Sequence, residues 1–266
     1  VSFLIFIMIN MAPGDPIARL QNPNITKEDL QAKYDELGIS DPIPVRYARW
    51  LGNFIKGDFG YSMDSTRAPV KELIAERVKP TLFLTIGAML LSIILAVPIG
   101  IISATRQYSV FDYVATFGAF LGVSIPSFFF GLVLLFIFSL KLSWFPSGGF
   151  SSATEANNLL TYLHHATLPI LALGLARVAS MTRYMRSSML EVIKEDYIRT
   201  ARAKGLKEKM VIYKHALRNA LIPVVTLVGL SVPLLFGGSL IIEEVFSYPG
   251  MRSEERRVGK ECTLRC

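Results

Sequence analysis

The sequence predicts an all-α membrane protein, a polytopic bundle of helices. The chain is 52% hydrophobic with a mean hydropathy of +0.42, values that few soluble domains reach. Its apolar residues also gather in four long runs without Asp, Glu, Lys or Arg, which are Pro80–Thr105, Tyr113–Leu140, Ala156–Ala176 and Asn219–Ile242. Each run meets the ~20 residues needed to cross a hydrocarbon core of roughly 30 Å. We therefore expect four full transmembrane helices; four buried helices of a soluble protein are the alternative.

A fifth apolar run opens the chain, from Val1 to Ala12. It is too short to cross a bilayer. It has neither a charged leader nor a start methionine, so it does not fit a signal peptide. We expect residues 1–12 to be the last part of a first transmembrane helix, which makes five visible spans with the first one partial.

Residues 13–79 are predicted to be an extracytoplasmic segment. The stretch Ala12–Lys79 holds ten Lys/Arg and ten Asp/Glu, and long loops translocate largely regardless of charge. Within it, "ITKEDLQAKYDELGI" has apolar residues at helical spacing, with Thr26 as the N-cap and Gly38 as the end. The stretch "RYARWLGNFIKGDFG" predicts a second short helix. Its apolar side is formed by Tyr47, Trp50, Leu51 and Phe54.

Charge indicates how the chain is oriented in the membrane. The segment Arg177–Asn219 holds eleven Lys/Arg against four Asp/Glu, which is typical of a cytoplasmic loop. Arg106 then marks a short cytoplasmic turn, and Ser143–His165 forms an outer loop. Five spans leave the carboxyl end outside, so we expect a sixth span beyond residue 251 to return it.

The last fifteen residues, Arg252 to Cys266, read "RSEERRVGKECTLRC" and break the apolar pattern. They resemble the translation of a common short-read sequencing adapter. We therefore expect residues 252–266 to be an assembly artefact; a genuine basic cytoplasmic tail is the alternative. Both cysteines of the chain, Cys262 and Cys266, lie here, and two thiols at this spacing are a weak sign of a metal site or disulfide.

The basic segment contains an amphipathic stretch, "YIRTARAKGLKEKMVIYKHALRNALIP", from Tyr197 to Pro223. Apolar residues recur in it at steps of three and four, which predicts one face of a helix. These residues are Leu206, Met210, Tyr213, Leu217 and Leu221. Gly205 follows small residues and predicts a sharp turn between two short helices. Pro223 falls in the first turn of the next span, where its missing N–H costs little.

Two interpretations fit this pattern equally well. The helix either lies on anionic lipid at the membrane surface, or it docks into a groove of a cytoplasmic partner.

The same stretch resembles the EAA loop of permease subunits in binding-protein-dependent ABC importers. Its glycine is Gly205, its final residues are Leu221-Ile222-Pro223, and Arg199–Ala203 carries the Thr-Ala-Arg-Ala form of the peptide-importer branch. Further segments fit that branch in the same order. They are "PGDP" (Pro13–Pro16), "GDFGYS" (Gly57–Ser62), "LIAERVKPTLFLT" (Leu73–Thr85), "SIPSFFFGL" (Ser124–Leu132) and "EEVFSYPGM" (Glu243–Met251). Together they resemble the first permease subunit of dipeptide, oligopeptide and nickel importers, which carry six spans.

The resemblance implies a transporter subunit in a bacterial or archaeal cell membrane, with residues 80–251 as its permease domain. An extracytoplasmic binding protein delivers the substrate, a second permease subunit completes the pathway, and two cytoplasmic ATPase subunits bind ATP and Mg²⁺. The chain lacks the G-x-x-x-x-G-K-[ST] phosphate loop and is expected to bind no cofactor. The cytoplasmic loop, at about residues 188–219, contacts the ATPase through Tyr197, Ala201, Ala203, Gly205, Leu206, Met210, Tyr213, Leu217 and, just beyond, Pro223. The resemblance also implies Met210, Val211 and Tyr213 as apolar anchors, with Lys207, Lys209 and Lys214 setting the docking register.

Peptides are the expected substrates, with nickel or other small solutes as the alternative. Candidate hydroxyls lining the pathway are Ser124, Ser127, Thr226 and Ser231; a hydroxyl bonded to its own helix backbone is the alternative for each. Pro98, Pro126 and Pro233 are expected to interrupt spans, either as hinges or as ordinary membrane-helix prolines.

Other classes of function fit poorly. Of the three histidines, His164 and His165 are expected on different sides of a helix, which makes them poor joint metal ligands. His215 has no acidic or cysteine partner at metal spacing. No nucleophile elbow or two-histidine zinc helix occurs, so we expect neither an enzyme nor a metal site. The positive charges follow membrane topology, which argues against nucleic-acid binding. A channel or receptor-like membrane protein without an ATPase is the remaining alternative.

Overall fold

The computed structural model describes residues 1–11, 41–62, 68–149 and 159–251. Within these ranges the regular structure is helical, apart from one isolated antiparallel bridge between Tyr61 and Pro69. The chain divides into two compact units, Val1–Glu76 and Arg77–Cys266. The helical character confirms the predicted all-α membrane fold. The predicted helix that starts at Ile25 and the tail from Arg252 lie outside the described residues.

The first unit contains α1 (Ser2–Met11) and α3 (Ile43–Ile55). An aromatic cluster joins them. The Phe3 and Tyr47 rings lie 4.9 Å apart, those of Phe6 and Trp50 5.8 Å, and those of Trp50 and Phe54 5.3 Å. The predicted apolar side of the second short helix is therefore confirmed for Tyr47, Trp50 and Phe54.

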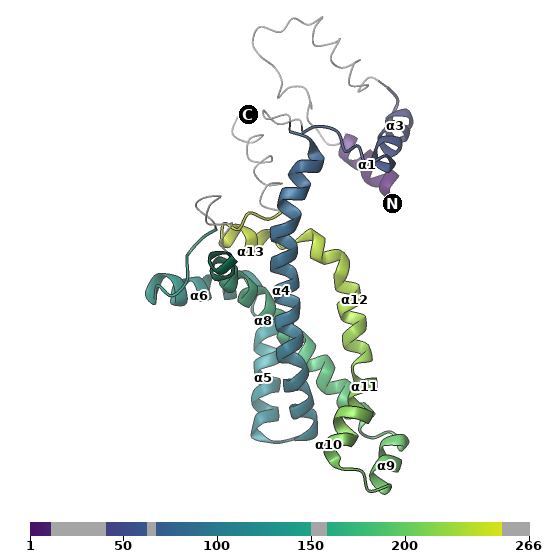
Figure 1. Ribbon diagram of the computed structural model, residues 1–266, viewed down its shortest axis with the longest axis vertical. Helices are drawn as coiled ribbons and strands as arrows, with labels where there is room; N and C mark the ends of the chain where they lie inside the picture. Colours follow the sequence, from purple (N-terminus) through teal and green to yellow (C-terminus); the bar gives the residue numbers. More distant parts are fainter. Residues whose placement is uncertain (12–40, 63–67, 150–158, 252–266) are drawn as a thin grey trace, which may run out of the picture. The chain divides into compact units, whose positions relative to one another are not determined.

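The second unit is built from longer helices (Figure 1). Their bounds are α4 Val70–Thr105, which begins in the first unit, α5 Val110–Ser124, α6 Ser127–Leu134, α8 Leu159–Val192, α12 Ile222–Gly237 and α13 Leu240–Val245. A π-helical segment, η2 (Leu135–Lys141), continues α6. Between α8 and α12 lie the short helices α9 (Asp196–Ala203), α10 (Glu208–Met210), η3 (Val211–Ala216) and α11 (Leu217–Ala220). In Figure 1 these short helices and the α4–α5 turn lie at the same end of the unit, and α13 lies at the opposite end.

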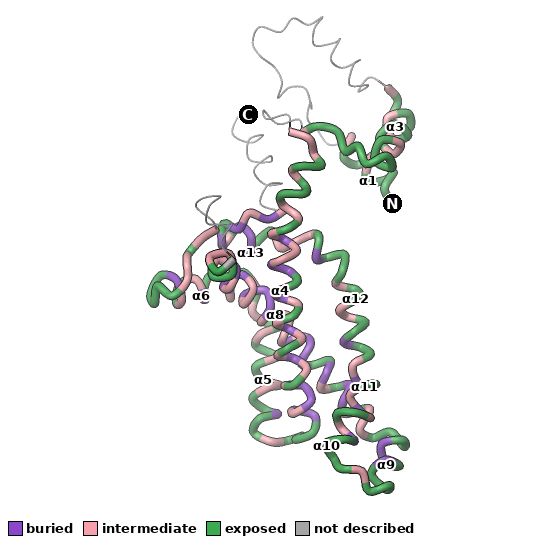
Figure 2. The backbone as a smooth tube through the Cα atoms, in the orientation of Figure 1, coloured by how far each residue is buried: buried purple, intermediate pink, exposed green. Residues whose placement is uncertain are grey.

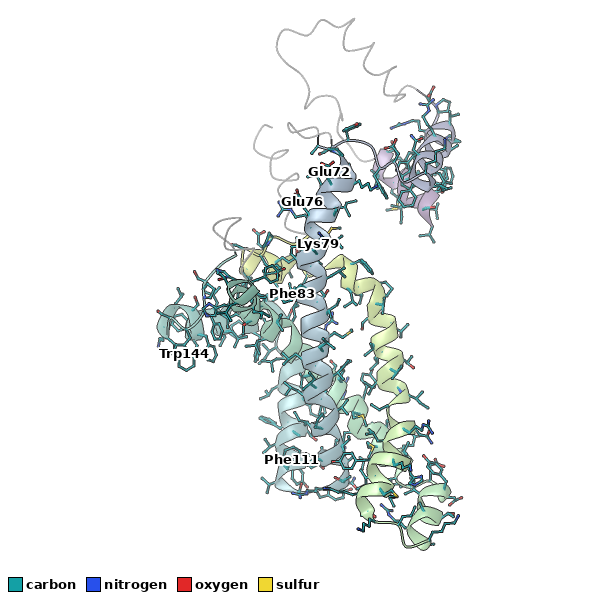
Figure 3. All side chains as sticks on the ribbon, viewed as in Figure 1. Glu72, Glu76, Lys79, Phe83, Phe111 and Trp144 are labelled. Atoms are coloured by element: carbon teal, nitrogen blue, oxygen red, sulfur yellow. The ribbon has the colours of Figure 1, made fainter. Side chains whose placement is uncertain are left out.

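The helix α4 is long and apolar enough to span a membrane on its own. Its charged residues lie on its first turns, where Figure 3 labels Glu72, Glu76 and Lys79, and the uncharged run follows. Two bent pairs qualify only if each is taken as one span: α5 with the helix Ser127–Lys141, and the helix Glu208–Ala220 with α12. The described part of the chain therefore shows one to three spans by length and composition, and the full count stays a prediction.

The apolar run Tyr113–Leu140 is not one straight span, and the predicted interruption at Pro126 is confirmed. Its two halves bend by 103° at Ile125 and Pro126. Ile125 is extended, with φ −86° and ψ 125°, because the residue before a proline is driven out of the helical region. By contrast, Pro98 and Pro233 lie inside continuous helices, so the prediction that they interrupt their spans is wrong.

The helix in the apolar run Asn219–Ile242 ends earlier than predicted. Helix α12 stops at Gly237, and Gly238 has a φ of +63°, a conformation that glycine adopts without strain. The chain then turns into α13, where Ile242 and Phe246, the residue that follows the helix, are buried beside Leu84 and Leu168. The remaining residues to Ile242 therefore pack across the end of the bundle.

At this end of the bundle, α13 is held by buried polar contacts. Glu243 is fully buried and accepts a hydrogen bond from the Thr81 hydroxyl at 3.3 Å. The Tyr248 hydroxyl donates to that of Tyr162 at 2.9 Å, and Tyr162 packs edge-on against Phe83 of α4, with ring centroids 4.8 Å apart. The "EEVFSYPGM" motif thus fixes this end of α4 to α8.

Helices α4 and α8 approach each other closely at Gly100. A Cβ atom on Gly100 would lie 2.6 Å from Met185 Cβ and 3.1 Å from the backbone nitrogen of Arg186. Real Cβ contacts are essentially never that short, so only glycine fits between these two helices. This contact positions the part of α8 that carries the short helices.

Candidate coupling site

The coupling loop, residues 188–219, begins as the last turn of α8 and continues through α9 (Asp196–Ala203). A second helical segment, Glu208–Ala220, follows and is called the coupling helix here. It consists of α10 (Glu208–Met210), the π-helical η3 (Val211–Ala216) and α11 (Leu217–Ala220). Leu221 ends it at a bend of 40°, and α12 begins with Pro223 in its first turn. The prediction of two short helices before a span that starts near Pro223 is confirmed.

Gly205 makes the turn between α9 and the coupling helix. Its φ is +73°, and its N–H donates to the Arg202 carbonyl at 2.9 Å while that of Leu206 donates to Ala201 at 3.4 Å. These two bonds form a Schellman motif, in which a left-handed residue ends a helix. A Cβ atom at Gly205 would meet nothing within 4 Å. The position therefore requires glycine for its backbone conformation and not for lack of space.

One side of the loop packs onto the membrane helices. Its buried residues are Ile198, Ala201, Val211, Ala216 and Ala220. They share a core with Met181, Met185 and Met189 of α8 and with Ala96, Ile101 and Ala104 of α4. Figure 2 shows this buried strip running through α9 and α11. Displacement of the coupling helix would therefore move α4 and α8 with it.

The other side of the loop is exposed and both aromatic and basic. Met210 is 43% exposed and Tyr213 54%. Four cationic residues, Lys207, Lys209, Lys214 and Arg218, are exposed around them. Tyr197 is also exposed, and its hydroxyl accepts a hydrogen bond from Asn219 at 2.8 Å, which joins the start of α9 to the end of the coupling helix. Ala203 and Pro223 are exposed as well.

The predicted apolar face is divided between these two sides. Leu206, Leu217 and Leu221 pack against the buried core, whereas Met210 and Tyr213 face outward. The π-helical segment Val211–Ala216 separates Met210 from Leu217 and Leu221. An i to i+5 turn holds one more residue than an α turn, so it shifts the leucines that follow it about the helix axis relative to Met210. Val211 is fully buried, so its expected role as a docking anchor is wrong.

A surface ion pair bridges the Gly205 turn. Arg202 donates to both carboxylate oxygens of Glu208, at 2.7 and 3.2 Å. The carboxylate raises the pKa of the Arg202 guanidinium. Both side chains are about half exposed, so the pair stabilises the turn by only about 0–1 kcal/mol.

A buried ion pair, which the sequence reasoning missed, ties three helices together near the same end. Arg186 of α8 donates to Asp112 of α5, from Nε at 2.6 Å and from Nη2 at 2.8 Å. The Ser103 hydroxyl of α4 also donates to Asp112, and so does the backbone N–H of Tyr108 at 3.0 Å. Ser109 followed by Asp112 just before an uncharged run does signal a capped helix start, but it does not indicate that Asp112 pairs with Arg186.

The predicted pathway hydroxyls mostly bond to their own helices. Ser124 donates to the Phe120 carbonyl at 2.9 Å, Thr226 to Ile222 at 3.0 Å and Ser231 to Leu227 at 2.8 Å. Ser127 is the first residue of α6. The structure brings none of these hydroxyls together with the coupling loop, and their role in a pathway stays a prediction.

The two neighbouring histidines contact backbone groups. His164 Nε2 lies 2.8 Å from the Trp144 carbonyl and His165 Nδ1 lies 2.9 Å from that of Thr161. The His164 ring also packs on Phe145, with centroids 5.1 Å apart. No group of three His, Cys, Asp or Glu side chains suited to a metal occurs among the residues that the structure describes.

Comparison with known proteins identifies the class of membrane protein to which this chain belongs. The family described as binding-protein-dependent transport system inner membrane component matches residues 96–257, which include the whole coupling loop. The chain belongs to this family. As a component of such a system it is a membrane permease and not itself an enzyme, and it works with a substrate-binding protein and an ATPase.

Several relatives match nearly the full chain. The oligopeptide transport system permease protein AppB of Bacillus subtilis is 44% identical over 251 residues, covering 94% of this chain and 79% of the relative. A putative peptide permease of Brucella suis is 44% identical over 253 residues, with the same coverage. The glutathione transport system permease protein GsiC of Escherichia coli is 40% identical over 251 residues, covering 94% of this chain and 78% of the relative.

Proposed function

We propose that this permease forms part of the pathway through which an ATP-driven importer takes up short peptides. The names of the relatives support this substrate class, because oligopeptides, peptides and glutathione are all compounds with amide-linked amino acids. A nickel or other small-solute permease remains the second candidate on the sequence resemblance alone. We place the chain as a multi-pass protein in a bacterial or archaeal cell membrane.

The observation that carries the mechanism is the two-sided coupling helix. Its exposed side offers Met210 and Tyr213 among lysines, the combination of apolar anchor and charged rim that suits a protein groove. Its buried side shares a core with α4 and α8. A cytoplasmic ATPase that binds the exposed side therefore moves α4 and α8 when it changes conformation.

Two ATPase subunits, two permease subunits and one binding protein make up the proposed importer. ATP and Mg²⁺ bind to the ATPase subunits, and closure of the ATPase pair pushes on the coupling helix. Because Asp112, Arg186 and Ser103 join α4, α5 and α8, these helices move as one rigid body. Such movement alternates access to the pathway from the two sides of the membrane.

Site-directed cross-linking tests the docking side directly. Tyr213→Cys is placed in a variant whose Cys262 and Cys266 are replaced by serine, and is co-expressed with the ATPase subunits of the same importer. We expect a thiol–amine reagent to join this cysteine to the ATPase. Val211→Cys is the matched control, because its side chain is fully buried and should not react. Equal cross-linking at both positions would contradict the assigned orientation.

Uptake measurements test the substrate. Membrane vesicles that hold the assembled importer and its binding protein should accumulate labelled di- or oligopeptide when ATP is supplied. Uptake of nickel without uptake of peptide would favour the second candidate. Uptake that is independent of ATP would instead point to a channel.

A further inference from the structure

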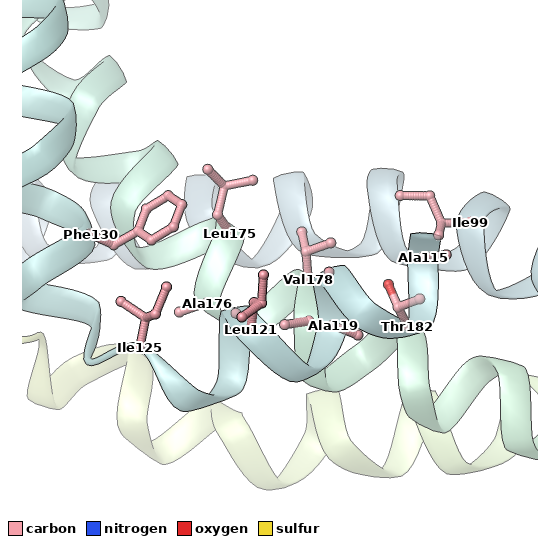
Figure 4. Close-up of a pocket in the computed structure, with 13 residues that line it drawn as sticks. Ile99, Ala115, Ala119, Leu121, Ile125, Phe130, Leu175, Ala176, Val178 and Thr182 are labelled. Atoms are coloured by element: carbon pink, nitrogen blue, oxygen red, sulfur yellow. The ribbon is translucent and has the colours of Figure 1, made fainter. Parts of the chain in front are cut away.

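A groove between α5 and α8 is not used by the proposed coupling mechanism. Its larger part is an apolar cavity of about 390 Å³ (Figure 4). Small residues of α5, Ala115, Gly118, Ala119 and Gly122, form one wall, and Ala176, Val178 and Ala179 of α8 form the other. The groove closes where a Cβ atom on Gly122 would lie 2.8 Å from Ala179 Cβ, and opens at Gly118, where a Cβ atom would meet nothing within 4 Å.

A second, more polar cavity of about 220 Å³ continues this groove. It shares Ala119 and Thr182 with the first cavity. Its other lining residues include Thr116, Arg183, Arg186 and Ser187. The combined space is therefore apolar at one end and lined by hydroxyls and guanidinium groups at the other. We call it the α5–α8 groove.

Thr182 at the junction indicates that the groove holds a ligand. The residue is 4% exposed, and its Oγ1 is buried without a hydrogen-bond partner, which no other side-chain nitrogen or oxygen in the described part of the chain shares. Threonine in a helix normally bonds to the carbonyl four residues earlier, as Thr226 does. A buried hydroxyl left unpaired is unfavourable, so an acceptor supplied by a ligand satisfies the geometry.

The polar end carries a net positive charge. Asp112 already balances Arg186 through two hydrogen bonds. Arg183 takes part in no ion pair among the described residues, and its guanidinium lies 5.8 Å from the centroid of the Tyr184 ring. A ligand with one anionic group therefore complements the Arg183 side.

The direction of the groove favours a lipid over a peptide. Arg183 and Ser187 lie on the stretch of α8 that leads into the basic coupling loop, which charge places on the cytoplasmic side. The apolar part, from Ala119 to Gly122 and on to Phe130, leads away from that side. A peptide needs hydrogen-bond partners for its amides along its length, whereas an acyl chain needs only apolar contact.

We propose that the α5–α8 groove binds an anionic phospholipid of the cytoplasmic leaflet. Its phosphate accepts hydrogen bonds from Thr182, Arg183 and Ser187, and one acyl chain lies along the small residues of α5. Basic pockets between membrane helices on the cytoplasmic side are suited to such head groups. The site rests on the proposed orientation of the chain and is independent of which solute the importer carries.

Native mass spectrometry of the complete importer tests this site. The complex is reconstituted with phosphatidylcholine containing phosphatidylglycerol, extracted in mild detergent, and the retained phosphatidylglycerol is counted per complex. Arg183→Gln removes the charge and Gly118→Leu fills the apolar part. We expect each variant to retain phosphatidylglycerol about tenfold more weakly, the effect of losing about one charge-assisted contact or its steric equivalent.

Arg106→Gln is the matched control, because Arg106 carries the same charge in the exposed α4–α5 turn at the same end of the unit. It should retain the lipid as the unaltered complex does. Equal retention by Arg183→Gln and the unaltered complex would overturn the proposal. The proposal would also be overturned if a photo-cross-linking residue at position 120 labelled the second permease subunit and no lipid. Peptide uptake is measured on the same complexes. Loss of lipid retention and loss of peptide transport can then be recorded separately, so a failure of the lipid site is not mistaken for a failure of the proposed function.

Discussion

Arg186 and Asp112 form a two-point contact, in which Nε donates to Oδ1 at 2.6 Å and Nη2 donates to Oδ2 at 2.8 Å. The neighbouring residues Met185 and Met189 of α8 pack in the core that holds the coupling helix. One short stretch of α8 therefore contacts the coupling loop through its methionines and α5 through its arginine. Through this stretch, a displacement of the coupling loop can reach α5, which, among the described residues, contributes none to the core that holds the loop.

Replacing Asp112 should break this connection. Asp112→Asn leaves the Arg186 guanidinium without its counter-charge, and breaking a buried pair destabilises a protein by about 3–5 kcal/mol. Because the Arg186 side chain is 25% exposed, we expect the lower end of that range. Thermal unfolding of the purified importer measures the effect. Asp196→Asn, in the exposed pair with Arg199, should change the unfolding temperature little, and an equal loss in both variants would refute the prediction.

Substitution of Gly205 should uncouple the permease. Proline fixes φ near −65°, whereas Gly205 has a φ of +73° and donates its N–H to Arg202. We expect Gly205→Pro to abolish uptake and transport-coupled ATP hydrolysis while the protein still inserts into the membrane. Gly205→Asn should retain most activity, since asparagine tolerates the left-handed conformation. Normal uptake by the proline variant would contradict the hypothesis that this loop docks onto the ATPase.

Val211 and Tyr213 should give opposite results although they are two residues apart. Val211 is fully buried, so Val211→Ala removes two buried carbon atoms and should destabilise the protein by about 2 kcal/mol. Tyr213 is 54% exposed, so Tyr213→Ala should leave the unfolding temperature unchanged and weaken binding to the ATPase. Chemical unfolding and a pull-down of the ATPase subunits measure the two effects. The reverse pattern would show that the helix is rotated in the assembly.

The close contact of α4 and α8 should not tolerate a methyl group at Gly100. Gly100→Ala places a Cβ atom 2.6 Å from Met185 Cβ, and overpacking of this kind costs about 1–3 kcal/mol. Gly229→Ala in α12 is the control, because its Cβ would meet nothing within 4 Å. That variant should be neutral or more stable by about 0.5–1 kcal/mol. Thermal unfolding distinguishes them, and equal stability of the two variants would contradict the helix contact.

Much of the fold is predictable from local patterns. The uncharged runs locate α4 and α12, the positive φ of Gly205 follows from its place after small residues, and Pro223 marks the start of α12. Each of these features depends on residues close together in the sequence. The membrane bundle and the basic loop can therefore be predicted from the sequence pattern, whereas the transporter class follows from the resemblance of the loop to the EAA loop of known permeases.

Features that depend on contacts between distant residues cannot be predicted from local sequence patterns. Asp112 and Arg186 are 74 residues apart. The residues around each of them give no indication that the two side chains form an ion pair. The π-helical segment that separates the exposed Met210 from the inward-packed Leu217 and Leu221 leaves no sign in the spacing of apolar residues. Thr182 looks like any helical threonine until the structure shows its hydroxyl buried and unpaired.

The bend at Pro126 restricts what can surround this chain. Helix α5 has 15 residues and rises roughly 22 Å, short of a hydrocarbon core of roughly 30 Å. Proline has no N–H, so the Gly122 carbonyl loses its usual partner four residues on, at a depth where lipid tails offer none. Hydrocarbon alone cannot supply the donor that this carbonyl lacks. The assembled importer must therefore place an N–H or O–H group, from another polypeptide or from water, beside the Gly122 carbonyl.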